Sequence, residues 1–169
     1  FRADKPQKGR FREFCQADCD IFGTTATLAD AEILAVFYAV FAELGCRSLV
    51  LEYNDREVLT SLLAPFATVS VPVASLTQSI DKLDKMSQEA VVTELVAKGL
   101  SATSASQALA ALTGATESTN LALIRQQAEA LGVPASALRF NPFLARGLDY
   151  YTGLIFEGKI PEYGVGSVG

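Results

Sequence analysis

The sequence contains no histidine and only three cysteines among its 169 residues. Without histidine, the chain cannot carry a Ser-His-Asp or Cys-His catalytic set, a histidine-ligated metal or a histidine pH switch. Any chemistry must therefore use carboxylates, arginine, lysine, hydroxyl groups or the substrate's own groups. The odd number of cysteines argues against a disulfide framework and indicates a reducing compartment, so we predict a cytoplasmic protein. Cys15 and Cys19 lack further partners at zinc-binding spacing, and we expect no protein-bound metal.

Long apolar runs are also missing from the sequence. The longest, Ile33 to Ala42, is too short to span a bilayer, and we expect no membrane partner. The net charge of −5 disfavours indiscriminate binding to nucleic acid. Basic residues nevertheless gather near the amino terminus, where their local field suits a polyphosphate or the end of an RNA. These residues are Arg2, Lys5, Lys8, Arg10 and Arg12.

Residues 10–21 alternate between polar and largely apolar side chains, which predicts a half-buried β-strand. Its polar face mixes cations, an aromatic ring, an amide and carboxylates, which is more typical of the floor of a binding site than of a solvated edge. That face carries Arg10, Arg12, Phe14, Gln16, Asp18 and Asp20. Pro6 to Gly9 reads as a loop before it. We expect the strand to lie antiparallel to another that starts near Tyr151.

Beyond residues 10–21, strands and helices are predicted to alternate in the amino-terminal and carboxy-terminal parts of the chain. A helix is predicted from Thr27 to Gly45, and its nearly continuous apolar surface indicates burial between layers. A strand follows at residues 48–53, then a helix capped by Asn54 or Asp55, then an extended piece at residues 69–73. Further strands are predicted near Arg139 and at residues 151–157. The pattern predicts an α+β fold in which an antiparallel sheet carries flanking helices.

Between these ends, residues 78–138 show helical patterning only, with Ser87 and Thr103 as candidate N-caps. A helical block between two halves of a sheet indicates an inserted domain. We therefore predict core segments at residues 1–77 and 139–169, separated by a helical insertion at residues 78–138.

Two peptides carry the functional signal. The peptide at residues 146–153 combines a cation, two aromatic hydroxyl groups and a turn flanked by glycine, which are the parts needed to hold an anion beside a planar polar ring. The two peptides are FRADKPQKGRFREFCQ at residues 1–16 and RGLDYYTG at residues 146–153. Together they resemble the histidyl-tRNA synthetases, a family of class II aminoacyl-tRNA synthetases. The first resembles motif 2 of that class, and the second resembles the family's histidine-binding peptide.

The resemblance implies a histidine–tRNA ligase, which activates histidine with ATP to histidyl-adenylate and transfers it to tRNA(His). It implies catalytic roles for Arg2 and Arg146 beside the α-phosphate. It implies ATP binding, with Mg²⁺, by Arg2, Asp4, Arg10 and Phe14. It implies histidine binding by Gln16, Asp20, Arg146, Tyr150 and Tyr151. It implies contact with the acceptor end of the tRNA at Lys5, Gln7 and Lys8.

Motif 1, motif 3 and an anticodon-binding domain are not recognisable, so we expect this chain to be an incomplete part of a homodimeric protein and to be inactive alone. Two related classes remain as alternatives. One is the synthetase-like regulatory subunit of ATP phosphoribosyltransferase. The other is the synthetase-like domain of kinases that sense uncharged tRNA. The presence of both Arg2 and the peptide at residues 146–151 favours the ligase.

Overall fold

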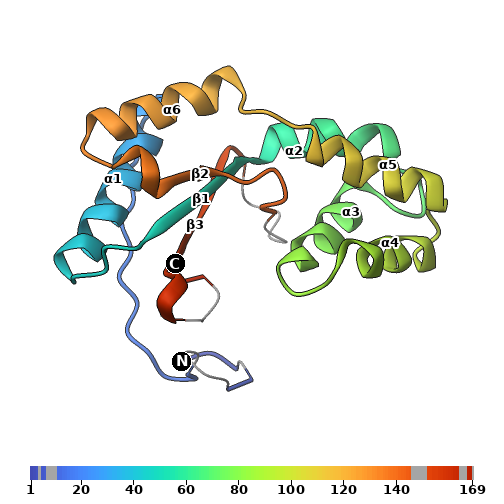
Figure 1. Ribbon diagram of the computed structural model, residues 1–169, viewed down its shortest axis with the longest axis horizontal. Helices are drawn as coiled ribbons and strands as arrows, with labels where there is room; N and C mark the ends of the chain where they lie inside the picture. The colour runs from blue at the N-terminus through green and yellow to red at the C-terminus, as the bar shows by residue number, and fades with distance from the viewer. Residues whose placement is uncertain (4, 7–10, 146–151, 164–166, 169) are drawn as a thin grey trace. The chain divides into compact units, whose positions relative to one another are not determined.

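The computed structural model describes residues 1–3, 5–6, 11–145, 152–163 and 167–168 (Figure 1). The chain divides into two compact units, each of which gathers segments that are distant in the sequence. The first unit comprises Phe1–Leu51, Ile124–Leu138 and Glu157–Gly169, and the second comprises Glu52–Leu123 and Arg139–Phe156. In the described part of the chain, no helix is both long and apolar enough to cross a membrane.

Helices and strands together confirm the predicted α+β class. The helices are α1 (Thr27–Glu43), α2 (Arg56–Leu63), α3 (Val73–Ile80), α4 (Gln88–Ala97), α5 (Ala102–Thr113) and α6 (Thr119–Ala130). The strands are β1 (Val50–Asp55), β2 (Leu138–Phe140) and β3 (Leu154–Lys159). Short 3-10 helices are η1 (Ala64–Phe66), η2 (Asp81–Asp84), η3 (Ala135–Ala137) and η4 (Pro161–Tyr163).

The strands form one small sheet in the order β2-β1-β3 (Figure 1). Tyr53 of β1 packs against Phe140 of β2, with ring centroids 6.2 Å apart. The next residue of β1, Asn54, bonds further along the chain at Pro142, so β1 and β2 run parallel. The sheet is therefore mixed, and its antiparallel part is the pair formed by β1 and β3.

The antiparallel pairing of β1 and β3 is visible at both ends of the strands. The backbone N–H of Arg56 donates to the carbonyl of Gly153 at 2.9 Å at one end. Leu49 faces Gly158 at the other end, and α1 covers the same glycine. A Cβ atom at Gly158 would lie 2.6 Å from Cε1 of Phe37. A larger residue at position 158 would therefore force the ring of Phe37 on α1 to move away from β3.

The burial predicted all round α1 is wrong for this chain. Ala31 and Leu34 are its fully buried residues, whereas Val36 and Val40 are 44% and 51% exposed. One face of the helix packs on the sheet around Gly158. An apolar composition indicates that a helix favours burial, but it does not determine whether another element covers the face opposite the sheet.

In the second unit, helices α2 to α5 lie together (Figure 1), and they share one hydrophobic core. Most of its members are aliphatic side chains that the helices direct inward at helical spacing, and Val71, Leu100 and Ala145 come from segments outside the helices. The core contains Leu59, Leu63, Val71, Leu76, Ile80, Val91, Leu95, Leu100, Ala105, Ala108, Leu109, Leu112 and Ala145. The core takes in α4 and α5 from the helix-only middle of the sequence, together with α2 and α3.

Helix starts in the second unit follow local capping chemistry. The predicted caps Asp55 and Ser87 accept hydrogen bonds from the N–H groups of Glu57 and Ala90. The prediction of Thr103 as a cap is wrong, because Ser101 caps α5. The piece predicted at residues 69–73, which Pro72 was expected to limit to an edge strand or a connector, is a connector between η1 and α3. Pro72 is extended, with φ −67° and ψ 165°, and Val73 begins α3.

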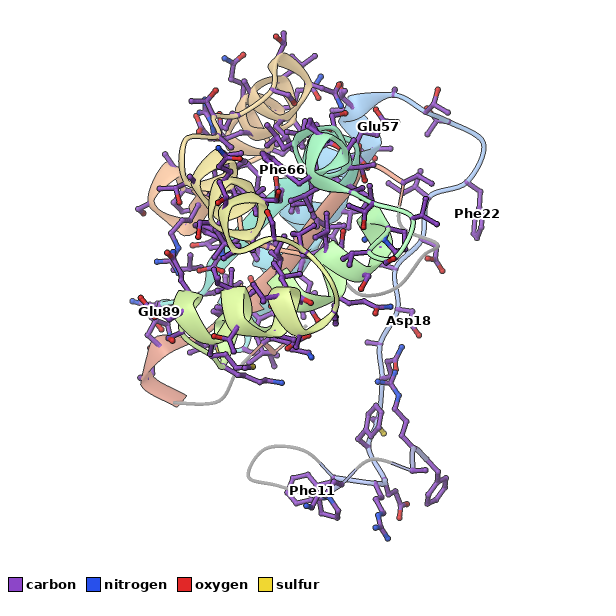
Figure 2. The ribbon with its side chains drawn as sticks, turned by 90° about the vertical axis from the view of Figure 1, so that its right-hand side faces the viewer. Phe11, Asp18, Phe22, Glu57, Phe66 and Glu89 are labelled. Carbon is purple, nitrogen blue, oxygen red and sulfur yellow. The ribbon has the colours of Figure 1, made fainter. Side chains whose placement is uncertain are left out.

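The strand predicted at residues 10–21 is not formed within the described residues 11–21, which are exposed throughout. Figure 2 draws Phe11, Asp18 and Phe22 along one extended stretch of chain. An extended segment becomes a strand only when another strand satisfies its backbone N–H and C=O groups. In the described sheet the strand neighbour of β3 is β1, and the described residues 11–21 form no strand, so the expected pairing of these residues with the strand after Tyr151 is wrong.

A network of charged and polar side chains links α4 to α3 and η2. Glu94 accepts hydrogen bonds from Lys82 at 2.8 Å and from the buried hydroxyl of Ser79 at 2.9 Å. Lys98 lies 3.0 Å from the same carboxylate. The bonds from Lys82, and then from Lys98, lower the pKa of Glu94 from 4.5 to about 2.

We expect Glu94→Gln to destabilise the chain by about 1 kcal/mol at pH 7, a modest value because Lys82 is 47% exposed and water screens the pair. A carboxyl group whose pKa is lowered by folding stabilises the native state above its unfolded pKa. That contribution is lost as the pH falls from 4.5 towards about 2. The difference in the free energy of unfolding between the wild-type chain and Glu94→Gln, measured by urea unfolding at several pH values, should shrink over that pH range.

The control is Glu129→Gln, which removes a one-turn pair with Arg125 on α6. Its effect at pH 7 should stay below about 0.5 kcal/mol. A difference for Glu94→Gln that is constant from pH 7 to pH 3 would contradict the assignment of the stabilisation to the ionised carboxylate.

Candidate functional site

The amino-terminal residues form a small cluster around Arg2. The carbon at the centre of its guanidinium group lies 5.0 Å from the centroid of the Phe14 ring. One guanidinium nitrogen donates to Oε1 of Gln16 at 2.8 Å, and the backbone N–H of Arg2 donates to the carbonyl of Arg12 at 2.9 Å. Nε2 of Gln16 in turn donates to Asp18 at 2.7 Å. The structure thus brings together three of the predicted site residues, Arg2, Phe14 and Gln16.

This cluster presents a cation, an aromatic face and an amide side by side. A guanidinium group stays charged at all accessible pH values and pairs with two phosphate oxygens at once. The face of Phe14, whose side chain is 41% exposed, can stack on a planar base. The arrangement therefore fits a ligand that joins a phosphate group to a ring. Contact with the ring of Phe14 stabilises the orientation of the guanidinium by about 0.5–1 kcal/mol at an exposed position.

Asp20 lies in a shallow hollow of about 220 Å³ at the start of α1. Thr24, Thr25 and Asp30 contribute to the same hollow. Two carboxylates there create a negative field, which suits a ligand that donates hydrogen bonds. The predicted common strand face of Gln16 and Asp20 is not formed, so this grouping rests on the hollow and not on strand register.

A second polar cluster lies at the end of β1. Oε2 of Glu52 accepts from Nδ2 of Asn141 at 2.8 Å. Nδ2 of Asn54 donates to the carbonyls of Pro142 at 3.2 Å and Leu144 at 3.0 Å. These bonds hold the turn that follows β2 against the central strand of the sheet.

Sequence reasoning missed the role of this second cluster. Asn54 was interpreted as an alternative to Asp55 in capping α2, and Asp55 takes that place. A buried strand that ends in polar residues is the signal that could have identified the cluster, because strand ends commonly carry functional side chains. The partners of Asn54 are about 90 residues away in the sequence, so no local pattern contains them.

Several predicted site residues lie outside the part of the chain that the structure describes. Of the candidates, Lys5 is described and exposed. The residues outside the described part are Asp4, Gln7, Lys8, Arg10, Arg146, Tyr150 and Tyr151. Their roles stay predictions from the resemblance.

Comparison with known proteins gives a consistent result. The family model described as histidyl-tRNA synthetase matches residues 1–166. A histidine–tRNA ligase of Gloeobacter violaceus is 36% identical over 190 aligned positions, which cover 100% of this chain and 40% of the relative. A histidine–tRNA ligase of Leifsonia xyli is 39% identical over 189 positions, which cover 97% of this chain and 43% of the relative.

Solved structures show the same fold. The histidyl-tRNA synthetase of Nostoc sp. PCC 7120 matches 82% of this chain and 38% of its own with a TM-score of 0.72 at 21% identity. A Bacillus halodurans protein described as an ATP phosphoribosyltransferase regulatory subunit/histidyl-tRNA synthetase matches 85% of this chain and 42% of its own with a TM-score of 0.65 at 18% identity. The chain spans about 40% of the length of the curated relatives that it matches.

Proposed function

The chain belongs to the histidyl-tRNA synthetase family, and on that premise we propose that it is the part of a histidine–tRNA ligase that holds ATP and histidine. The contact of Arg2 with both Phe14 and Gln16 is the observation that carries this proposal. It joins a residue assigned to the α-phosphate, one assigned to adenine and one assigned to histidine. A site that joins ATP to histidine must bring residues for both substrates into contact.

For ATP, Arg2 would pair with the α-phosphate while Phe14 stacks on the adenine ring. The exposure of both side chains supports this role, since each remains accessible to a ligand. Asp4 would accept hydrogen bonds near the adenine, and Arg10 would hold the outer phosphates with Mg²⁺.

For histidine, the resemblance assigns contacts with the substrate to Gln16, Asp20, Tyr150 and Tyr151. An imidazole ring presents N–H donors, and the negative hollow around Asp20 supports a role in accepting them. An apolar amino acid of similar size would leave the carboxylate without its partner, which disfavours its binding.

Activation of histidine joins its carboxylate oxygen to the α-phosphorus of ATP, and the bond from that phosphorus to the oxygen of the leaving pyrophosphate breaks. The attacking carboxylate is already ionised, so no general base is needed. The absence of histidine from this chain is compatible with that chemistry. Arg2 and Arg146 would stabilise the negative charge that develops on the phosphoryl oxygens.

Three further assignments follow from family membership. Lys5, Gln7 and Lys8 would approach the acceptor end of tRNA(His). Residues 78–138 would form the helical insertion between core segments 1–77 and 139–169. The complete protein would be a cytoplasmic homodimer, as the resemblance implies.

The second candidate is a synthetase-like regulatory subunit of ATP phosphoribosyltransferase. The match to the Bacillus halodurans protein, whose description includes that role, supports it. Retention of Arg2 in contact with Phe14 and Gln16 favours the ligase, because a regulatory subunit has no need of a complete reactive set.

Exchange of labelled pyrophosphate into ATP tests the proposed function. The complete protein should catalyse exchange that depends on histidine, and no other amino acid should replace it. The chain of 169 residues alone should show none, since it spans about 40% of its relatives. Exchange by this chain alone would contradict the assignment of necessary residues to the remaining part. A complete protein that activates ATP phosphoribosyltransferase and catalyses no exchange would establish the second candidate.

A further inference from the structure

The side-chain amide of Gln16 lies between two groups of opposite chemistry. A guanidinium nitrogen of Arg2 donates to its Oε1 at 2.8 Å, and its Nε2 donates to Oδ1 of Asp18 at 2.7 Å. A guanidinium group can only donate, and an ionised carboxylate can only accept. If the amide turned over, donors would face donors on one side and acceptors would face acceptors on the other. The two neighbours together therefore allow one orientation of the amide.

Asp18 stands at one end of this row of contacts. At the other end, the guanidinium group of Arg2 lies 5.0 Å from the centroid of the Phe14 ring, and the backbone N–H of Arg2 donates to the carbonyl of Arg12 at 2.9 Å. Arg2 is thus held independently of Gln16. Asp18 holds the far end of the amide, because an amide bonded at Oε1 alone can still pivot about that bond.

The contact with Asp18 suits an exposed position. It joins an amide to an ion, and a hydrogen bond to a charged group is stronger than one between neutral groups. The two residues are only two positions apart, so little chain has to be ordered for the carboxylate to reach Nε2. Both side chains are exposed, and a substitution there leaves no cavity in a core. Replacing Asp18 should therefore change the amide and leave the folded core intact.

The amide that is fixed in this way keeps groups for a ligand. Oε1 has two lone pairs and Nε2 has two N–H groups, and the bonds to Arg2 and Asp18 use one of each. The amide can therefore offer one further acceptor and one further donor, in places that Arg2 and Asp18 set. Histidine carries both kinds of partner, since its imidazole ring has an N–H group and its carboxylate accepts.

We propose that Asp18 is a positioning residue that holds the Gln16 amide in the orientation that binds histidine. Asp18 acts through Gln16 and needs no contact of its own with the substrate. It is not among the residues that the resemblance assigns to either substrate, and its bond to Gln16 is the observation that gives it a role. This inference rests on the proposed role of Gln16 in binding histidine.

The test replaces Asp18 with alanine in the complete protein. In pyrophosphate exchange, the KM for histidine should rise by about 3- to 10-fold, the factor that corresponds to one hydrogen bond, and kcat should stay within about threefold of the wild-type value. Asp18→Asn, whose amide can present either a donor or an acceptor to Gln16, should lie between the wild-type protein and Asp18→Ala. The matched control is Glu13→Ala, which removes an exposed carboxylate from the same stretch and should leave KM and kcat within about twofold of the wild-type values.

A double-mutant cycle separates positioning from a direct effect of the charge. If Asp18 acts through Gln16, Asp18→Ala should change the KM for histidine by less than about twofold in a protein that already carries Gln16→Ala. An equal effect of Asp18→Ala in both backgrounds would overturn the inference, because the carboxylate would then act on the substrate independently of the amide. So would an unchanged KM in Asp18→Ala.

Nuclear magnetic resonance tests the contact without activity. In the 169-residue chain labelled with ¹⁵N, the side-chain N–H signals of Gln16 should move in Asp18→Ala and stay in place in Glu13→Ala. Signals that stay in place in Asp18→Ala would contradict the proposed contact and overturn the inference. A complete wild-type protein without histidine-dependent exchange would overturn the proposed function, while these signals would still decide whether Asp18 holds the amide.

Discussion

Replacing Arg2 with alanine in the complete protein should lower kcat for histidine-dependent pyrophosphate exchange by about 10²–10³-fold, the range found when one donor to a developing negative charge is removed. The guanidinium group is oriented by the ring of Phe14 and by Gln16. Negative charge at the α-phosphate grows between the ground state and the transition state. An interaction with that charge therefore affects kcat more than KM.

Two further variants sharpen this result. Arg2→Lys keeps the charge but loses the planar fork, so its kcat should lie between those of the wild-type protein and Arg2→Ala. Arg47→Ala removes an exposed cation from the turn between α1 and β1 and should leave kcat within about threefold of the wild-type value, as surface substitutions usually do. If Arg2→Ala raised only the KM for ATP and left kcat intact, Arg2 would be a binding residue without a catalytic role.

Replacing Asp20 with alanine should chiefly raise the KM for histidine, by roughly 30- to 700-fold. This factor corresponds to the loss of about 2–4 kcal/mol of binding free energy, which is expected for a charge-assisted contact. Asp20 offers only acceptors, and it lines a hollow that Asp30 makes more negative. Its contact with the imidazole ring would be present in both the ground state and the transition state. The variant should also discriminate less well against amino acids without ring N–H groups.

Steady-state exchange at saturating and sub-saturating histidine measures this split. Glu32→Ala is the control, because it removes an exposed carboxylate of α1 and changes the net charge equally. The KM for histidine should then stay close to that of the wild-type protein. A lower kcat with an unchanged KM in Asp20→Ala would show that Asp20 acts on the reaction and not on recognition of the ring.

Local chemistry made several parts of this fold predictable from the sequence. Asp55 and Ser87 cap helices because their side chains reach N–H groups two or three residues ahead. Gly45 ends α1 with a φ of 82°, which glycine adopts without strain. In each case the interacting atoms belong to one short stretch of chain, so the sequence contains the whole interaction.

The features that escaped prediction depend on partners that are distant in the sequence. Alternation at residues 10–21 indicates which side chains a strand would bury, but pairing needs a second strand, and these residues have none in the described sheet. The bonds of Asn54 to Pro142 and Leu144 likewise join segments about 90 residues apart. Alternation had placed Phe14 and Gln16 on one polar face, but their contact with Arg2 joins positions more than ten residues apart that no local pattern connects.

The two edges of the three-stranded sheet determine how readily it could join another sheet. Its outer strands are β2 and β3, whose outward backbone groups could pair with a second chain and begin aggregation. β2 has three residues and is followed closely by Pro142, so it offers few groups for such pairing. Along β3, Ser167 bridges to Lys159, and the N–H of Val168 donates to the carbonyl of Gly158 at 2.8 Å. Brevity limits pairing at β2, and at β3 the bonds from residues 167–168 occupy the end of the strand at Gly158 and Lys159.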